Sequence, residues 1–320
     1  MDIFLNKKAE KFIDDIPVFC EDMYWGKSKE NVLLEAINVI DSDGWSKFND
    51  RFSKKFDYSL DESLADWHFN IPINKDFVVL DIGAGLGRHS IPLSQFAKKV
   101  VSVDNSISRM RFLKRFIKNR NINNISVCVA DIFDLPFKEN SFDLIVLNGV
   151  VEWIGKTKFF KDHRQAQIVA LQSCYRLLKN GGYLYIGIEN RFALSYLRGT
   201  DHSGLRFTSY MPRFVADIYC RLRGRGPYDT YTYNKGGYLK LLKESGFQQD
   251  NISFFLPYPG YNCPKIVIPY EKLNILRYVI QVIMSSTGWK KNIIKRLSSY
   301  DIFLRIYRKF FFSFNIIAKK

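Results

Sequence analysis

The chain has few cysteines and no long apolar run. Its 320 residues include five cysteines, at wide and irregular spacings: Cys20, Cys128, Cys174, Cys220 and Cys263. An odd, scattered set argues against a disulfide framework or a structural zinc, and it favours a reducing compartment. The N-terminal segment has no apolar core of signal-peptide length, and no uncharged run approaches the roughly 20 residues that span a bilayer. We therefore expect a cytoplasmic protein.

Acidic residues are fewer than basic residues, most of all near the C-terminus. The formal net charge is +16, of which residues 271–320 carry +9, with eleven Lys and Arg against two acids. A basic segment that is also aromatic and apolar favours an anionic partner. We expect residues 290–320 to bind an anionic membrane surface at its inner face, with nucleic acid as the weaker alternative. A solvated basic surface, or a C-terminal helix packed on the body, remains open.

The residue pattern predicts three regions. Residues 1–70 are rich in aromatics and lack strand alternation, which predicts an N-terminal helical cap. Residues 71–270 predict one α/β domain with an insertion at 191–235 that is rich in Arg, Tyr and Gly. Residues 271–320 predict a basic amphipathic helical tail of one or two helices, broken near Gly288.

Buried apolar runs alternate with helical patterns in the middle region. Strands are predicted at 77–83, 100–104, 125–131, 142–148, 182–190 and 251–258, and helices at 88–99, 106–119, 163–180 and 236–247. This alternation is typical of a parallel sheet with helices on both faces. We expect a Rossmann-like doubly wound α/β fold with a mostly parallel sheet of seven strands.

A glycine-rich turn follows the first predicted strand, in the sequence VVLDIGAGLGRHS (78–90). Gly83, Gly85 and Gly87, with Ala84 between them, allow a tight turn and a close approach to a ligand. A dinucleotide site would favour a third glycine at position 88, which is arginine here. S-adenosylmethionine has no phosphate and carries positive charge, which suits an acid just before the turn, Asp81.

Further landmarks end the next three predicted strands. Asp104, followed by Asn105, can accept hydrogen bonds from both hydroxyls of a ribose, a feature that dinucleotide sites share. Asp131 can accept from an adenine amino group, with the Ile132 N–H opposite the ring. Asn148 can bind the amino end of the cofactor or the acceptor. Each of the two aspartates can instead be an ordinary cap, and Asn148 a turn residue.

These landmarks, in this order, resemble a known family. Residues 77–190 are similar to class I S-adenosylmethionine-dependent methyltransferases, in the glycine-rich first motif, the acidic end of the second strand and LLKNGGYLYI. Residues 142–261 also resemble bacterial methyltransferases found with surface-polysaccharide and glycosyl-transfer enzymes. The phrases that carry this narrower resemblance are LNGVVEWIG, IGIENRFALSYLRGTDHSG, TSYMPR, YDTYTYNKGGYLKLLKESGF and LPYPGYNCPK. The resemblance implies a sugar or glycan-linked acceptor.

Three residues are candidates for the chemistry of methyl transfer. His202, in the inserted loop, is the first candidate for a general base because its ordinary pKa lies near neutrality. Glu152 and Glu189 are the nearby carboxylates. The alternatives are an exposed loop histidine for His202 and a simple ion pair with Arg191 for Glu189. His89, after the glycine turn, is the second candidate base.

An acceptor pocket can draw on aromatic and basic residues of the insertion. Tyr231 and Tyr233 can stack on sugar rings, while Arg191 and Arg206 can hold phosphates or carboxylates. Asp201 and His202 form only a single adjacent pair, so we predict no metal site.

The favoured function is methyl transfer from S-adenosylmethionine, with S-adenosylhomocysteine as product, to a hydroxyl of a small molecule, glycan or lipid-linked saccharide. An RNA methyltransferase and a non-catalytic cofactor-binding protein stay open as alternatives. A dinucleotide-dependent oxidoreductase is disfavoured by Arg88 and Asp131. The oligomeric state has no signal in the sequence.

Overall fold

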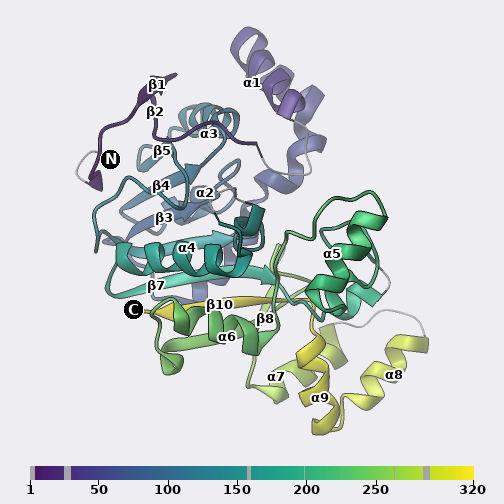
Figure 1. Cartoon of the computed structure of the whole chain (residues 1–320). Coiled ribbons are helices and arrows are strands. Elements are labelled where there is room, and N and C mark those ends of the chain that lie inside the picture. Colours follow the sequence, from purple (N-terminus) through teal and green to yellow (C-terminus); the bar gives the residue numbers. More distant parts are fainter. Residues whose placement is uncertain (1–3, 25–29, 157–159, 198, 263, 284–288) are drawn as a thin grey trace. The chain divides into compact units, whose positions relative to one another are not determined.

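The computed structural model describes residues 4–24, 30–156, 160–197, 199–262, 264–283 and 289–320 (Figure 1). The chain forms two compact units, which divide it differently from the three predicted regions. The first unit comprises Met1–Leu147, Gln172–Leu184 and Lys320, and the second comprises Asn148–Leu171 and Tyr185–Lys319. Among the described residues, no helix is both long and apolar enough to cross a membrane.

The first unit holds most of the predicted α/β alternation. Its elements are β1 (Lys11–Ile13), β2 (Ile16–Val18), α1 (Glu30–Leu60), η2 (Glu62–Asn70), β3 (Val78–Ile82), α2 (Ser90–Ser94), β4 (Lys99–Asp104), α3 (Ile107–Asn119), β5 (Ile125–Val129) and β6 (Phe142–Asn148). Helix α4 (His163–Leu177) and strand β7 (Leu178–Glu189) each contribute residues to both units.

The second unit contains the insertion and the C-terminal elements. They are η3 (Val151–Lys156), η4 (Leu194–Leu197), η5 (Thr208–Tyr210), α5 (Arg213–Leu222), α6 (Lys235–Glu244), η6 (Gln249–Asn251), β8 (Ile252–Tyr258), β9 (Ile266–Pro269), α7 (Leu273–Tyr278), η7 (Val279–Ile283), α8 (Trp289–Leu297), α9 (Asp301–Tyr307), η8 (Arg308–Phe310) and β10 (Ser313–Lys319). The elements labelled η are 3₁₀ helices, except η7, which is a π-helix.

Within the described ranges the sheet has ten strands rather than the seven expected, in the order β1-β2-β5-β4-β3-β6-β7-β10-β8-β9. Strands β2, β5, β4, β3 and β6 pair in parallel, whereas β1 with β2, and β10 with β8 and β8 with β9, pair antiparallel. The α/β core is therefore confirmed, and the strand number is corrected. Three of the additional strands, β1, β2 and β10, lie in regions predicted as helical.

The predicted elements of the core agree with the structure in position, with two corrections. Helix α3 begins after Ser106, whose side chain accepts a hydrogen bond from the Arg109 amide, as expected for an N-cap. The helix predicted at 88–99 is only the short α2. The helix predicted at 163–180 ends at Leu177, because the backbone is already extended in β7 from Leu178 onward.

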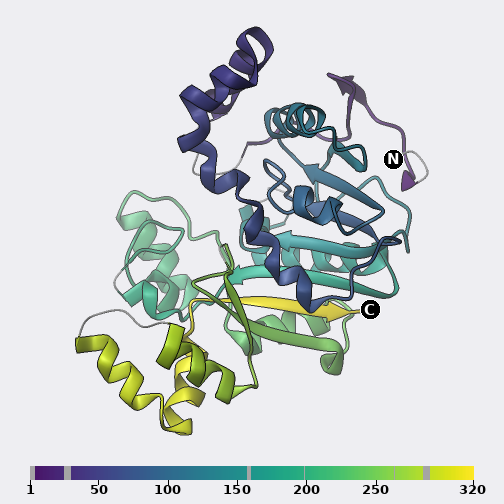
Figure 2. The same cartoon turned by 180° about the vertical axis from the view of Figure 1, so that it is seen from behind.

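The N-terminal region packs on α3 through aromatic rings and through charge. Trp45, Phe48 and Phe56 of α1 contact the rings of Phe112 and Phe116 on α3, and α1 bends at Gly44, whose φ is 81°. Figure 2 shows α1 from behind. This packing accounts for the aromatic richness of the first 70 residues.

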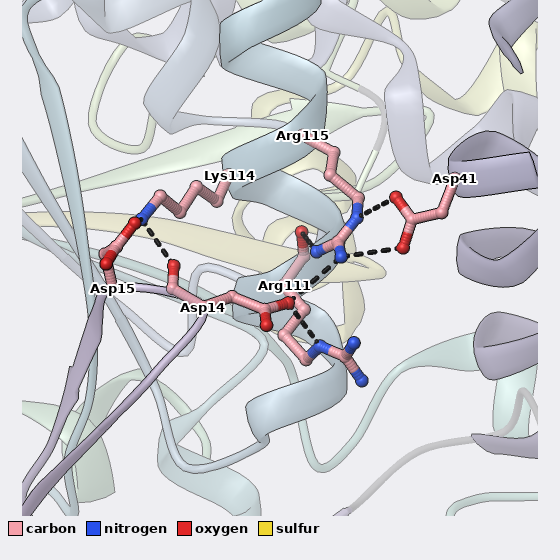
Figure 3. Close-up of polar contacts among 6 residues, drawn as sticks. All are labelled: Asp14, Asp15, Asp41, Arg111, Lys114 and Arg115. Atoms are coloured by element: carbon pink, nitrogen blue, oxygen red, sulfur yellow. Dashed lines mark hydrogen bonds and ion pairs between the residues drawn. The ribbon is translucent and has the colours of Figure 1, made fainter.

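A cluster of ion pairs joins the β1–β2 turn and α1 to helix α3 (Figure 3). Asp14 accepts from Arg111 Nε at 2.8 Å and from Arg115 Nη2 at 3.0 Å, while Arg115 also binds both carboxylate oxygens of Asp41. Asp14 and Asp15 both have positive φ, as the central residues of a two-residue hairpin require. The hydrogen bond from Arg111 holds the pKa of Asp14 below its ordinary value.

The C-terminal segment is corrected from a helix to a strand. All residues of β10 but the last are buried, and β10 lies between β7 and β8 in the sheet. The segment 311–318 is aromatic and apolar apart from Ser313 and Asn315, and periodicity alone does not distinguish so short a segment from a helix. Residues 313–318 are buried in the sheet and are therefore not available to a membrane surface.

The assignment of residues 313–319 to strand β10 predicts that two isoleucines near the C-terminus contribute unequally to the free energy of unfolding. Ile316 of β10 is fully buried opposite Phe254 of β8, whereas Ile302 of α9 is 71% exposed. We expect Ile316→Ala to lower the free energy of unfolding by about 2–5 kcal/mol, through lost burial and a cavity. The matched Ile302→Ala should change it by less than about 0.5 kcal/mol. Urea unfolding of both variants checks this, and equal effects would contradict the assignment.

Candidate functional site

The glycine turn between β3 and α2 has the backbone that its sequence predicts. Gly83, Gly85 and Gly87 have φ values of 70°, 58° and 92°, a region that other residues rarely adopt. A Cβ on Gly87 would lie 2.3 Å from Leu113 Cδ1, whereas a Cβ on Gly85 would meet nothing within 4 Å. Gly87 therefore permits close packing on α3, and Gly85 faces open space where a ligand can approach the backbone.

Asp104 at the end of β4 holds this turn in place. Its Oδ2 accepts from the Gly85 amide at 3.0 Å, its Oδ1 accepts from the Ser106 amide at 3.0 Å, and Arg109 lies 3.4 Å away. The Gly83 and Ala84 amides donate to the Val103 carbonyl. The carboxylate thus joins the turn to the start of α3, and its predicted role at a ribose stays a prediction.

Asp81 lies beneath the turn, buried in a short hydroxyl network. The Ser90 hydroxyl donates to Asp81 Oδ2 at 2.5 Å, and Ser102 in turn donates to Ser90. Burial raises the pKa of Asp81 to about 7, despite the hydrogen bond from Ser90. Asp81 thus orients the first residue of α2, and its contact with the charged end of the cofactor stays a prediction.

Asp131 and Asn105 mark two further edges of this site. Asp131 is half-buried after β5 and accepts from the Phe133 amide at 2.9 Å, and Ile132 beside it is also half-buried. Burial raises the pKa of Asp131. The Asn105 carbonyl accepts from the Met23 amide, and the Tyr24 ring lies under the Arg109 guanidinium. An N-terminal segment therefore borders the site, which no local pattern predicted.

Histidine 89, the second candidate base, is a buried core residue. Its Nδ1 accepts from Trp67 Nε1 at 3.3 Å. Burial lowers its pKa to about 3, so the ring stays neutral under physiological conditions. We therefore assign His89 to the packing of α2 against η2.

The three catalytic candidates of the sequence come together in the second unit. Glu152 lies in η3 just after β6, Glu189 ends β7, and His202 follows in the insertion. His202 Nε2 lies 3.2 Å from Glu189 Oε1, and one donor atom from each of the three residues lies within 4.8 Å of the others. Glu189 therefore pairs with His202 rather than with Arg191.

Two aromatic residues complete this cluster. The Tyr261 hydroxyl donates to Glu189 Oε1 at 3.1 Å, and the Trp153 indole packs edge-on against the His202 ring at 4.8 Å between centroids. Sequence reasoning named neither residue as part of the site. Both nevertheless lie in phrases that carry the narrower resemblance, LPYPGYNCPK and LNGVVEWIG.

The two carboxylates of the cluster differ in their protonation. Burial and the charge of Glu189 raise the pKa of Glu152 well above its ordinary value. Burial would also raise the pKa of Glu189, but the hydrogen bond and charge of His202 outweigh it and lower that pKa. A neutral acid beside a charged carboxylate is an arrangement that suits proton transfer.

Asn148 and the predicted pocket residues are largely engaged in structural contacts. Asn148 Oδ1 accepts from the Tyr185 hydroxyl, and a Cβ on Gly187 would lie 2.0 Å from that oxygen. The Arg191 guanidinium donates to the carbonyls of Ser209 and Met211. Burial lowers the pKa of Arg191. The assignment of Arg191 to an acceptor anion is therefore weakened.

The predicted tyrosines are held by an arginine that sequence reasoning missed. The Arg213 guanidinium lies 3.7 Å from the centre of the Tyr231 ring and 4.5 Å from that of Tyr233. The Tyr233 hydroxyl donates to Gln167 at 2.7 Å, which makes this tyrosine a core residue. Arg206 is exposed.

Comparison with known proteins identifies the domain. Residues 80–186 match the family described as a methyltransferase domain. Phosphoethanolamine N-methyltransferase 1 of Caenorhabditis elegans is 30% identical over 176 residues, which cover 50% of this chain and 34% of the relative. The tRNA N(3)-methylcytidine methyltransferase Mettl2 of Drosophila melanogaster is 30% identical over 127 residues, 38% of this chain and 37% of the relative.

Two further likenesses extend over more of the chain. A ubiquinone/menaquinone biosynthesis C-methyltransferase of Wigglesworthia glossinidia brevipalpis is 30% identical over 175 residues, 51% of this chain and 62% of the relative. A solved phosphoethanolamine N-methyltransferase 2 of Haemonchus contortus, in complex with S-adenosyl-L-methionine, is 18% identical, with a TM-score of 0.48, over 89% of this chain and 59% of that one. The chain spans less than two thirds of each of these proteins.

Residues 80–186 thus match a methyltransferase domain, and the cofactor expected from the sequence, S-adenosylmethionine, is confirmed. The open face of Gly85 and the half-exposed Asp131 fit such a ligand. The relatives are named for acceptors as different as phosphoethanolamine, tRNA and a quinone precursor, so the family leaves the acceptor undetermined.

The site predicts unequal roles for two aspartates three residues apart. Asp131 directly follows Ala130, whose amide donates to the Asp104 carbonyl, whereas Asp134 is 74% exposed and pairs with Lys7. We expect Asp131→Ala to weaken binding of S-adenosylmethionine about 10- to 100-fold, the effect of removing one hydrogen bond to a charged acceptor. Asp134→Ala should bind as the wild type does. Calorimetric titration measures both, and an unchanged dissociation constant in Asp131→Ala would remove this residue from the adenine site.

Proposed function

We propose that this protein transfers the methyl group of S-adenosylmethionine to a hydroxyl of a small molecule or glycan, with a lipid-linked saccharide as the leading acceptor. The observation that carries the proposal is the buried cluster of Glu152, Glu189 and His202. A hydroxyl must lose its proton when its oxygen is methylated, and a paired imidazole and carboxylate supply a base for it.

The proposal of a sugar acceptor rests on the three sequence segments that contribute the residues of this cluster. LNGVVEWIG contributes Glu152, IGIENRFALSYLRGTDHSG contributes Glu189 and His202, and LPYPGYNCPK contributes Tyr261. Three phrases distant in the sequence thus supply one group of contacting side chains. This convergence supports a shared role in acceptor chemistry, and the narrower resemblance favours a glycan as that acceptor.

The pairing of His202 with Glu189 suggests how the proton moves. His202 Nε2 lies 3.2 Å from Glu189 Oε1, and we propose that the neutral ring carries its proton on Nε2, toward this carboxylate, and keeps the lone pair on Nδ1. As the acceptor oxygen attacks the methyl carbon and the carbon–sulfur bond breaks, Nδ1 takes the hydroxyl proton, and Glu189 stabilises the imidazolium that forms. The bound cofactor supplies the electrophilic methyl group.

We further propose that α8 and α9 contact the cytoplasmic surface of a membrane, where lipid-linked saccharides are found. Their exposed apolar residues are Ile293, Leu297, Tyr300, Ile302 and Ile306. Exposed basic residues, Arg296 and Arg305, lie on the same two helices. Apolar and basic side chains together favour an anionic interface. The proposal replaces the longer segment 290–320, because β10 is buried.

The proposed base predicts a selective loss of methyl transfer. With methyl-labelled S-adenosylmethionine and polyprenyl-diphosphate-linked oligosaccharides, we expect label in an alkali-stable methyl ether. His202→Gln should lower the transfer rate about 10²- to 10⁴-fold, the usual contribution of a general base, without changing the affinity for the cofactor. Glu244→Gln, which alters an exposed carboxylate paired with Arg164, serves as the control.

Two outcomes would contradict this assignment. Wild-type transfer rates in His202→Gln would exclude the imidazole as the base. Cofactor binding without transfer to any oligosaccharide, free or lipid-linked, would favour another acceptor or the non-catalytic alternative.

The membrane proposal predicts a loss of vesicle binding on acidic substitution of α9. Ile302→Glu with Ile306→Glu should lower partitioning onto phosphatidylglycerol-containing vesicles at least about tenfold, since apolar area is lost and negative charge is added. Phe69→Glu, which alters a 74% exposed ring of η2, should bind as the wild type does. Co-sedimentation at fixed salt measures this. Stronger binding to RNA than to vesicles would favour the RNA methyltransferase instead.

A further inference from the structure

The cluster in the second unit contains buried carboxylate oxygens that accept no hydrogen bond from the described residues. Glu152 has no exposed surface, and neither of its carboxylate oxygens has a hydrogen-bond partner among the described residues. Glu189 Oε2 is also buried and also has no hydrogen-bond partner among the described residues. Within the described part of the chain, the only ion pair to either carboxylate comes from His202. Buried polar oxygens without partners are costly, and a cation bound in place of the Glu152 proton would give these oxygens a partner.

We propose that Glu152, Glu189 and His202 bind a divalent first-row transition-metal ion, Mn²⁺ or Zn²⁺. One donor atom from each residue lies within 4.8 Å of the other two, and the closest measured pair, His202 Nε2 and Glu189 Oε1, is 3.2 Å apart. Ligand bonds of about 2.0–2.2 Å place the donors of one ion some 3–4 Å apart. Small side-chain rotations therefore complete the site.

The donor set selects the class of ion. Mg²⁺ and Ca²⁺ prefer oxygen ligands alone, whereas an imidazole with two carboxylates suits ions such as Mn²⁺ and Zn²⁺. Three protein ligands leave coordination positions open, as in catalytic rather than structural metal sites. The ion would give both orphaned oxygens of Glu152, and Glu189 Oε2, a partner that the described residues do not provide.

The residues around the donors hold them in the orientation that an ion requires. Tyr261 donates to Glu189 Oε1, and Trp153 packs against the His202 ring. Gly149 brings the backbone close, since a Cβ there would lie 3.2 Å from the Tyr261 hydroxyl and 3.7 Å from Glu152 Oε1. Such outer partners normally orient metal ligands and raise affinity.

No metal site was predicted from the sequence, because the three ligands are far apart along the chain and follow no spacing motif. For its role, this inference rests on the proposed function: an acceptor hydroxyl bound at an open position would have its pKa lowered by the ion. With the ion present, His202 would be a ligand instead of the base, and the hydroxyl, its pKa lowered by the ion, would release its proton to water.

The test is metal binding by the full chain, stripped of metal and without cofactor or acceptor. Mn²⁺ is titrated and the free ion is followed by electron paramagnetic resonance, with Zn²⁺ as competitor. We expect one site per chain. Glu152→Gln and His202→Gln should each weaken binding at least about tenfold, since each loses a direct ligand. Glu244→Gln, an equal loss of charge at the surface, should bind as the wild type does.

A thermal measurement guards against misfolded variants. Mn²⁺ should raise the Tm of the wild type, because it binds the folded state, and leave the Tm of Glu152→Gln unchanged. Without metal, Glu152→Gln should be at least as stable as the wild type, because a neutral amide replaces a buried acid.

Two results would overturn the proposal: absence of stoichiometric Mn²⁺ or Zn²⁺ binding, or wild-type affinity in Glu152→Gln. Because the titration contains no cofactor or acceptor, failure of methyl transfer leaves it unaffected. Loss of transfer in His202→Gln without any metal binding would support the base and reject the metal.

Discussion

The central strands of the sheet are buried on both faces, and this constraint determines where polar chemistry can lie. Strands β3, β4 and β6 are almost wholly buried. Charged side chains in such strands would lose their hydration without gaining a partner, so they gather where the strands end. Asp104, Asn148 and Glu189 each occupy the last position of a strand. The turns beyond these ends supply the glycines and aspartates of the cofactor site and the acids of the cluster.

The acids at and near the strand ends differ in the number of hydrogen bonds that their carboxylates accept. Asp104 accepts two backbone hydrogen bonds and lies beside Arg109, so its charge is well solvated by the protein. Asp81 has one serine partner under full burial, and its pKa is raised to about 7. Neither carboxylate oxygen of Glu152 has a hydrogen-bond partner among the described residues, and burial together with the charge of Glu189 raises the pKa of Glu152 well above its ordinary value. The number of hydrogen-bond partners, and not burial alone, therefore distinguishes acids with a structural role from candidates for proton transfer.

Local patterns predicted the α/β core because the responsible interactions are themselves local. Strand β6 and helix α3 could be read from continuous apolar runs and from the Ser106 cap, since each depends on residues that are neighbours in the chain. Helix α2 was predicted too long and β7 too short, because the transitions at 94 and 178 depend on contacts with other elements. Strand β10 was missed for a further reason: its sequence, SFNIIAK, is too short to distinguish a strand from the end of a helix, and its burial comes from its place between β7 and β8.

The sequence by itself determined the methyltransferase domain, its cofactor and the three candidate residues Glu152, Glu189 and His202, because motifs near strand ends obey short-range rules. Only the tertiary structure decided what these residues contact. It paired Glu189 with His202, turned Arg191 toward backbone carbonyls and buried His89 beneath Trp67. The paired residues lie 13 to 22 positions apart in the chain, and the energies of these contacts depend on burial and on partner geometry. Neither quantity is encoded in any stretch of sequence short enough to read as a motif.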